Sequence, residues 1–432
     1  MRLTLSCFSH FRFETRCSVN QVLRSLLKER HIQKLLAARL TSNFGNGLGP
    51  IALAFGVLDL PGATAKTLSV VVFAQMLPLV ALMLFGGVIA DRYPRALIVG
   101  GSDIALSIFV ICNGVMFLTG TATVPSLVII GVLSGVLHAL WWPAMSALPT
   151  ELVEEDQLQQ INSVVGISSN VTYMLGTVTG GIIVAAIGSG WAIVLDGISF
   201  MIAGILVVQL RKFGNRREQN EDSPTVLQDL RDGWFEFKSR TWVVVVVLGY
   251  SIIAMLMESL FTVVGPTHAK LHLGGPKPWS WILASMTAGM LVAVAVTLKY
   301  KPHRPIFVGI IAQIFVGLWW LALGTTEFIP VLLLGALAAG FAMDFFMVLW
   351  MTTLQKQIPK ESLSRVSSYD AFGSLILAPL GIVVAGPLVN KFGTVAVLHV
   401  YTAAFFIVLF AILSVRSVRQ LANSEPELQA SD

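Results

Sequence analysis

The chain has 432 residues, of which 55% are hydrophobic and only 12% are charged. A soluble domain carries about 25% charged residues, so this chain cannot cover a water-facing surface and we expect lipid around it. Its net charge of +5 is spread over short loops, which excludes a nucleic-acid-binding protein that gathers its basic residues on one face.

The first 34 residues precede the first apolar stretch. Within them, residues 21–34 have the pattern of an amphipathic helix, and we expect this segment to lie on the inner membrane surface. The first ~30 residues have no continuous apolar core, so they do not resemble a secretory signal.

Twelve apolar windows follow, each near the length of about 20 residues that a bilayer core requires. They occur at 35–58, 68–90, 96–119, 124–149, 162–187, 191–210, 242–264, 279–298, 305–324, 329–353, 366–389 and 394–415. The fifth window is rich in Ser, Thr and Asn, so it should face protein or water rather than lipid. The sequence therefore predicts an all-α membrane protein with twelve transmembrane helices.

Basic residues set the expected orientation of these spans. With a cytoplasmic N-terminus, 25 of the 29 Lys and Arg residues fall on the inner side. Positively charged loops stay in the cytoplasm, so we expect both termini to be cytoplasmic. We expect the protein itself to lie in the inner (plasma) membrane.

The chain divides into two halves of six spans. The hydrophilic linker 211–241 separates the bundle 35–210 from the bundle 242–415, and a tail follows at 416–432. At an offset of 205 residues, Gly135 matches Gly340, Gly176 matches Gly381 and Gly181 matches Gly386. Chance matches in a Gly-rich chain are the alternative. Internal duplication is typical of secondary transporters, whose substrate site lies at mid-depth between the halves.

The loop after the second span resembles the signature of the major facilitator superfamily, Gly-x-x-x-Asp-Arg-x-Gly-Arg-Lys/Arg. The matching residues are Gly87, Asp91, Arg92 and Arg95, while Pro94 and Ala96 depart from the pattern. Further echoes, which include Trp142-Pro143-Ala144, resemble the drug:proton antiporter branch that contains macrolide and enterobactin exporters.

The resemblance implies a conformational latch at this loop. Asp91 would contact the N-terminus of the eleventh span, where a carboxylate is stabilised by about 0.3–1 kcal/mol. Arg95 would pair with Glu151 at the foot of the fourth span. The alternative is that these charges only flank the spans.

Small residues in the fifth span resemble the antiporter motif, with Thr177 at the position where proline is usual. Gly residues four apart let helices approach closely, and plain packing is the alternative role. The predicted helix-packing residues are Gly176, Gly180, Gly181, Gly381, Gly386 and Pro387.

Ionisable residues inside spans are the strongest functional candidates, because each costs about 2.5–3.5 kcal/mol at a span centre. We expect Asp344 to exchange the coupling proton and Glu258 to attract a cationic or polar substrate group, with His138 as a third proton-coupling candidate. A helix–helix hydrogen bond is the alternative role for each acid, and a packed histidine for His138. The two acids lie at different depths: Glu258 is on the order of 9 Å, and Asp344 roughly 22 Å, from the outer end of its span.

In the superfamily that the chain resembles, the first, fourth, seventh and tenth spans line the cavity. The predicted cavity residues are Asn43, Asn46, Gln75, Trp142, Met255, Met347 and Trp350. Methionine and aromatic side chains give an adaptable apolar wall, although an aromatic stripe also suits lipid or packing neighbours.

The sequence carries no signal of an enzyme, a cofactor or a metal site. It has no Gly-rich phosphate loop followed by Lys-Ser/Thr, and its three cysteines have no metal spacing. We expect a monomer, with a small-molecule substrate, protons and membrane lipid as its partners. The predicted activity is export of small amphiphilic molecules (drug, macrolide or siderophore type) by proton antiport with alternating access. The alternatives are a proton-coupled nutrient importer and a non-transporting membrane sensor or partner protein.

Overall fold

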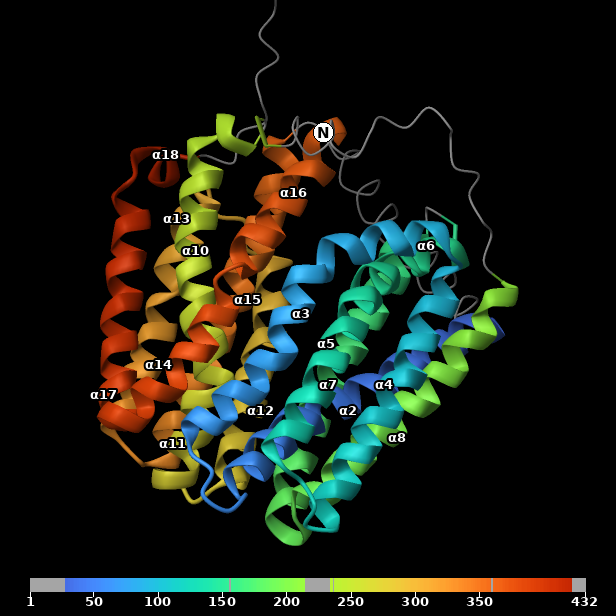
Figure 1. Ribbon diagram of the computed structural model, residues 1–432. Coiled ribbons are helices and arrows are strands. Elements are labelled where there is room, and N and C mark those ends of the chain that lie inside the picture. The colour runs from blue at the N-terminus through green and yellow to red at the C-terminus, as the bar shows by residue number, and fades with distance from the viewer. Residues whose placement is uncertain (1–27, 155–156, 214–233, 236, 359, 422–432) are drawn as a thin grey trace, which may run out of the picture.

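The computed structural model describes residues 28–154, 157–213, 234–235, 237–358 and 360–421, and these residues form a helical bundle (Figure 1). Six long helices form the first half, which we call the N-half. They are α2 (Arg30–Leu58), α3 (Ala65–Arg92), α4 (Arg95–Leu118), α5 (Val124–Ala147), α7 (Leu158–Ile187) and α8 (Ser189–Val208). A short helix, α6 (Pro149–Leu152), joins α5 to α7, and a 3₁₀ turn, η2 (Gln209–Lys212), follows α8.

The second half, which we call the C-half, has more interrupted helices. Its first pass is α10 (Thr241–Ser259), the π-helical segment η3 (Leu260–Val264) and α11 (Gly265–His272) in succession. The other passes are built from α12 (Pro276–Thr297), α13 (Pro305–Ala312) with α14 (Ile314–Thr325), α15 (Ile329–Gln357), α16 (Lys360–Leu375) and α17 (Ala378–Ser414), after which α18 (Arg416–Arg419) ends the described chain.

The predicted twelve-helix fold is confirmed. Ten helical segments of the described chain are long and apolar enough to cross a membrane by composition alone. The first pass, α2, falls outside that set, and its sequence carries Arg39, Asn43 and Asn46 along its length. The last segment contains two passes, because the backbone turns at Gly393, where φ is 80°. That left-handed conformation favours glycine.

Two faces of the bundle can be distinguished in Figure 1. The terminal face carries the start of α2, α6, α16 and α18, and the distal face carries the turns at 59–64, 119–123 and 273–275. The predicted interfacial segment 21–34 is described only from residue 28, and its last five residues are the first turn of α2. The rest of that segment and most of the linker lie outside the described residues.

Glycines set the closest helix contacts, and they do so in the same way in both halves. A Cβ on Gly176 of α7 would come within 2.0 Å of the Phe44 carbonyl of α2. Its repeat equivalent Gly381 of α17 stands in the same relation to the carbonyl of Met255 of α10, at 2.2 Å. Phe44 and Met255 are 211 residues apart, six more than the two glycines, so the contacted helices are repeated as well but with a six-residue difference in spacing. The added carbon would overlap backbone atoms, so only glycine permits this spacing.

The interface between the halves shows the same two-fold relation. Gly181 of α7 faces Ser280 of α12, and Gly386 of α17 faces Ser69 of α3. The hydroxyl of Ser69 donates a hydrogen bond to the carbonyl of Ile382. Gly181 and Gly386 therefore lie between the halves, as expected of helices that seal one half against the other.

Polar contacts join the halves at the distal face. The Lys270 ammonium lies 2.6 Å from a carboxylate oxygen of Asp59, and the Asn390 amide donates to the Thr64 hydroxyl at 3.0 Å. The halves separate from there toward α6 and α16 (Figure 1). The distal face is therefore the closed one in this conformation.

Candidate functional site: a cavity between the halves

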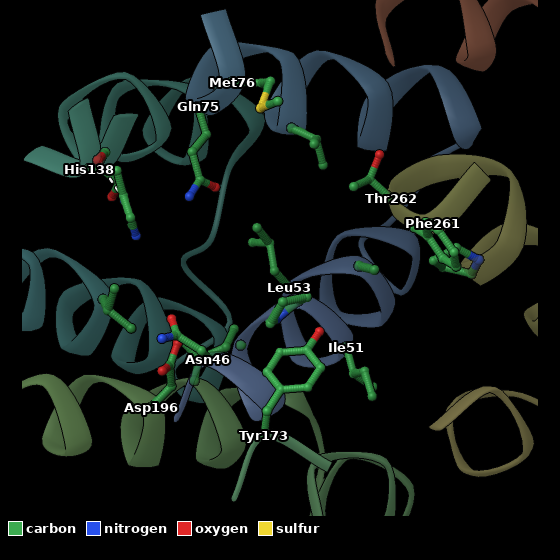
Figure 2. A pocket seen from close by; sticks show the side chains of 18 of the residues that line it. Asn46, Ile51, Leu53, Gln75, Met76, His138, Tyr173, Asp196, Phe261 and Thr262 are labelled. Carbon is green, nitrogen blue, oxygen red and sulfur yellow. Dashed lines mark hydrogen bonds between the residues drawn. The ribbon is translucent and has the colours of Figure 1, made fainter. Parts of the chain in front are cut away.

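A cavity of about 660 Å³ lies between the halves and is lined by residues of both. Drug-sized ligands occupy pockets of about 300–1,000 Å³ with mostly apolar walls and a few polar groups. The polar side chains on the N-half wall are Asn43, Asn46, Gln75, Asn113, Ser134, His138, Asn170, Tyr173 and Asp196. The C-half wall contributes Glu258, Thr262 and Thr287 as its polar side chains. Figure 2 shows His138, Gln75, Asn46 and Tyr173 on one side and Phe261 and Thr262 on the other.

The two walls differ at positions related by the internal repeat. Gln75 of α3 and Met286 of α12 are equivalent, because a Cβ on Gly135 would meet the Gln75 carbonyl and one on its repeat partner Gly340 would meet the Met286 carbonyl. Both residues line the cavity. His138 of α5 is equivalent to Met343 of α15 at the repeat offset of 205 residues, and both also line the cavity. The N-half thus presents hydrogen-bonding groups where the C-half presents thioethers, which are polarisable and adapt their shape to a ligand.

The predicted cavity residues divide into two groups. Asn43, Asn46 and Gln75 line this cavity, and Trp142 lines a neighbouring one. The other three, Met255, Met347 and Trp350, are not among the residues that line either cavity.

Packing accounts for the position of those three side chains. Met255 lies against Gly381 in the contact between α10 and α17. Met347 is 52% exposed on the outside of the bundle. The Trp350 indole is buried and donates a hydrogen bond to Asp370 at 2.9 Å. Their types suited an apolar wall, but the sequence does not give the rotation of a helix about its axis.

The ionisable candidates also divide. Glu258 and His138 lie on the cavity wall, whereas Asp344 is half-buried and only its neighbour Met343 reaches that wall. Nδ1 of His138 donates to the Ser134 carbonyl at 2.9 Å, which leaves Nε2 available to the cavity. Tyr173 of the N-half and Glu258 of the C-half both line the cavity, one on each wall.

A second cavity, of about 540 Å³, adjoins the first and extends toward the terminal face. Asn43, Asn46 and His138 line both cavities. The Arg39 guanidinium lies 5.4 Å from the centre of the Trp141 ring and interacts electrostatically with Asp103, and all three residues line the second cavity. The two cavities together form a passage from the mid-depth site toward the terminal face.

Asp196 of α8 is not among the cavity residues predicted from the sequence, and the structure places it on the cavity wall. Its carboxyl rests over Gly45 and Gly49 of α2, whose missing side chains make the space. These two glycines are four residues apart and share one helix face. That spacing was the available signal that a side chain from another helix would rest there.

The predicted latch is described in part. Arg95, at the start of α4, lies 3.5 Å from a carboxylate oxygen of Glu151 in α6, as expected. Partial burial raises the pKa of Glu151, and the charge of Arg95 opposes that shift. Gly87, Asp91 and Arg92 belong to the last turns of α3, and their side-chain surroundings lie outside the described part of the structure. The latch role itself stays a prediction.

Among the residues that the structure describes, no three His, Cys, Asp or Glu side chains gather as a metal ion would require. The described polar groups of the cavity are instead spread over several helices of both halves. Such an arrangement suits reversible binding of a molecule within a mostly apolar chamber.

The sequence matches the family description of the Major Facilitator Superfamily over residues 35–381. The chain belongs to this superfamily. It is 26% identical over 375 residues to the multidrug efflux pump Tap of Mycolicibacterium fortuitum, which covers 83% of this chain and 89% of Tap. It is 24% identical over 334 residues to YkuC of Bacillus subtilis (strain 168), an uncharacterised MFS-type transporter, which covers 73% of this chain and 75% of YkuC.

Solved structures of superfamily members share the fold. The nucleoside transporter NupG superposes with a TM-score of 0.68 at 12% identity, covering 89% of this chain and 99% of NupG. A bacterial homologue of the iron transporter ferroportin gives a TM-score of 0.67 at 17% identity, covering 89% of this chain and 98% of the other. This major facilitator chain is thus a multi-pass integral membrane protein with a transporter fold.

Proposed function

We propose that this major facilitator protein exports small amphiphilic molecules in exchange for protons. The observation that carries the proposal is the cavity between the halves, because most of its hydrogen-bonding groups lie on the N-half wall, whereas the C-half wall presents three methionines (Met286, Met290 and Met343) beside Glu258, Thr262 and Thr287. An amphiphile satisfies both walls at once, whereas a strongly polar nutrient would leave the methionine wall in contact with polar groups.

Two further observations support export by proton exchange. Relatives aligned over most of this chain are named multidrug efflux pumps, among them Tap of M. fortuitum. Glu258 and His138 place titratable groups on the cavity wall, and a transporter that couples to protons requires such groups where the substrate binds. Asp344 is a weaker candidate for this step, because the cavity is lined by its neighbour instead.

Accumulation of ethidium and of a macrolide in cells tests the direction of transport. Cells that express the protein should hold less of either compound than cells with the empty vector, and an uncoupler that collapses the proton gradient should abolish the difference. Higher accumulation would favour an importer, and it would contradict the proposal.

Purified protein in liposomes tests the coupling. An imposed pH step should drive ethidium movement in the direction opposite to protons. If neither a pH step nor a substrate gradient moves ethidium, a macrolide or a siderophore, the protein is better described as a sensor or partner protein.

A further inference from the structure

The carboxyl of Asp196 occupies an unusual position on the cavity wall. The residue is 6% exposed, and its Oδ1 atom is buried with no hydrogen-bond partner. A Cβ on Gly45 would lie 2.5 Å from Oδ1, and one on Gly49 would lie 2.4 Å from Oδ2. Gly49 itself lines the cavity, so the carboxyl rests against the two glycines, which we call the glycine seat, at the edge of the chamber. Figure 2 shows the Asp196 side chain beside Asn46.

Charged groups nearby do not neutralise this carboxyl. On the helices packed against α8, the ionisable groups at cavity depth are Arg39 of α2, Asp103 of α4 and Tyr173 of α7. His138 lies on the same wall of the cavity, and Glu258 lies across it. None of these forms a described ion pair or hydrogen bond with Asp196, and Arg39 and Asp103 line the neighbouring cavity.

Burial without a partner determines which form of the carboxyl suits this conformation. An ionised carboxylate removed from water is strongly destabilised unless a counter-charge or several donors compensate for it. The neutral acid avoids that cost, and its hydroxyl needs only one acceptor. A positive charge that enters the cavity would reverse the balance, because it would compensate the ionised form.

We propose that Asp196 is the carboxyl through which the N-half binds and releases a proton during transport. In the empty cavity the acid holds the proton. When a cationic group of the transported molecule arrives, the O–H bond of Asp196 breaks, the proton passes to cavity water, and the carboxylate pairs with the cation. This inference rests on the proposed proton exchange and adds a second cavity carboxyl, in the half opposite Glu258.

The glycine seat supplies a specific variant for the test. The three heavy atoms nearest to a Cβ on Gly49 all belong to the Asp196 carboxyl. Gly49→Ala should therefore displace that carboxyl and leave the helix packing intact, and alanine also favours a helix over glycine. Gly101→Ala is the matched control, because a Cβ at Gly101 of α4 meets nothing within 4 Å.

Infrared difference spectroscopy of the full chain in detergent reads the proton directly and requires no substrate. At neutral pH, the wild-type spectrum minus that of Asp196→Asn should contain the C=O stretching band of a protonated, buried carboxylic acid. The band should shift or vanish in Gly49→Ala and remain unchanged in Gly101→Ala. Adding ethidium should bleach the band in the wild type. A protonated-acid region that is identical in the wild type and both Asp196 and Gly49 variants would overturn the proposal.

Transport in liposomes separates this proposal from the proposed function. Asp196→Asn lacks the counter-charge for the cation, so it should exchange internal for external ethidium only at higher ethidium concentrations than the wild type. In this variant a pH step should move ethidium no faster than in protein-free liposomes. Full pH-driven transport in this variant would also overturn the assignment. If the wild type moves no ethidium at all, the proposed function fails, while the infrared comparison still decides whether Asp196 holds a proton. If Asp196→Asn does not fold, Gly49→Ala and Gly101→Ala provide the same comparison.

Discussion

The two halves of this transporter share a backbone frame but differ in the chemistry of their cavity walls. Gly176 and Gly381 contact equivalent carbonyls in their own halves, and Gly181 and Gly386 face equivalent serines of the opposite half. At equivalent positions of the two cavity walls, however, the N-half has the polar residues Gln75 and His138, and the C-half has Met286 and Met343.

This difference follows from what each position must do. A glycine whose missing Cβ admits a neighbouring backbone cannot change without moving a helix, because packed interiors leave no room for an added carbon. A side chain that faces a cavity has no such neighbour, so its type is free to follow the ligand. The duplication therefore preserves the frame and leaves the two cavity walls free to differ.

The largest expected effect comes from breaking the frame between the halves. In Gly386→Ala, the new Cβ would lie 2.6 Å from Lys66 Cα and from Ser69 Cβ, so α3 and α17 must move apart. Overpacking of this kind costs about 1–3 kcal/mol. We expect transport to be lost. We also expect weaker disulfide formation between Thr64→Cys and Asn390→Cys, whose native side chains meet at 3.0 Å on the distal face.

Gly101→Ala again serves as the control for an added methyl group on a membrane helix, since its Cβ meets no neighbouring atom. Equal cross-linking in Gly386→Ala and Gly101→Ala would show that the distal closure does not depend on the glycine contact.

The next effect distinguishes two acids within the C-half. Glu258 lies on the cavity wall and Asp344 does not. We expect Glu258→Gln to slow pH-driven transport by about tenfold, equivalent to about 1.4 kcal/mol, and Asp344→Asn to leave most of it. Ethidium flux in liposomes after a pH step measures both. A larger loss in Asp344→Asn would return the proton-coupling role to the residue favoured by the sequence.

Exchanging the walls should change affinity more than rate. Gln75→Met makes the N-half wall resemble its C-half equivalent and removes a hydrogen bond worth about 0.5–1.5 kcal/mol, so we expect KM to rise roughly 2–12-fold. Met286→Gln, the reciprocal change, should weaken binding of apolar substrates instead. Concentration dependence of transport, compared for a macrolide and ethidium, tests this. Equal effects of the two variants on every substrate would contradict two distinct walls.

The smallest effect is expected at the distal ion pair. The side chains of Lys270 and Asp59 are 36% and 63% exposed, and exposed pairs contribute about 0–1 kcal/mol. Lys270→Ala should therefore lower the melting temperature and the transport rate only slightly. The difference from the wild type should shrink further at high salt, where exposed charges are screened. A large, salt-independent loss would mean that this pair, rather than the glycine contacts, closes the distal face.

Much of the fold could be predicted from the sequence because lipid restricts the alternatives. A bilayer requires long apolar helices, so the apolar stretches of the sequence predicted the transmembrane helices. The repeated glycines predicted the division into two halves. The same reasoning identified Asn43, Asn46, Gln75, Glu258 and His138, because polar residues in membrane helices tend to face a cavity or another helix.

The choice between a cavity and another helix depended on tertiary structure. Asp344, Met255 and Trp350 had the residue types expected of a cavity wall, but helix rotation and neighbours such as Gly381 and Asp370 direct them elsewhere. The π-helical segment after Glu258 adds to this difficulty, since it changes the phase of the seventh span.

By itself, the sequence determined that this chain crosses a membrane as two related six-helix bundles, because the lengths of the apolar stretches and the spacing of the repeat can be read along the chain without its fold. Tertiary structure decided which carboxyl lacks a partner. The seat of Asp196 is made by two glycines about 150 residues away in the chain, and burial depends on every helix that surrounds a side chain.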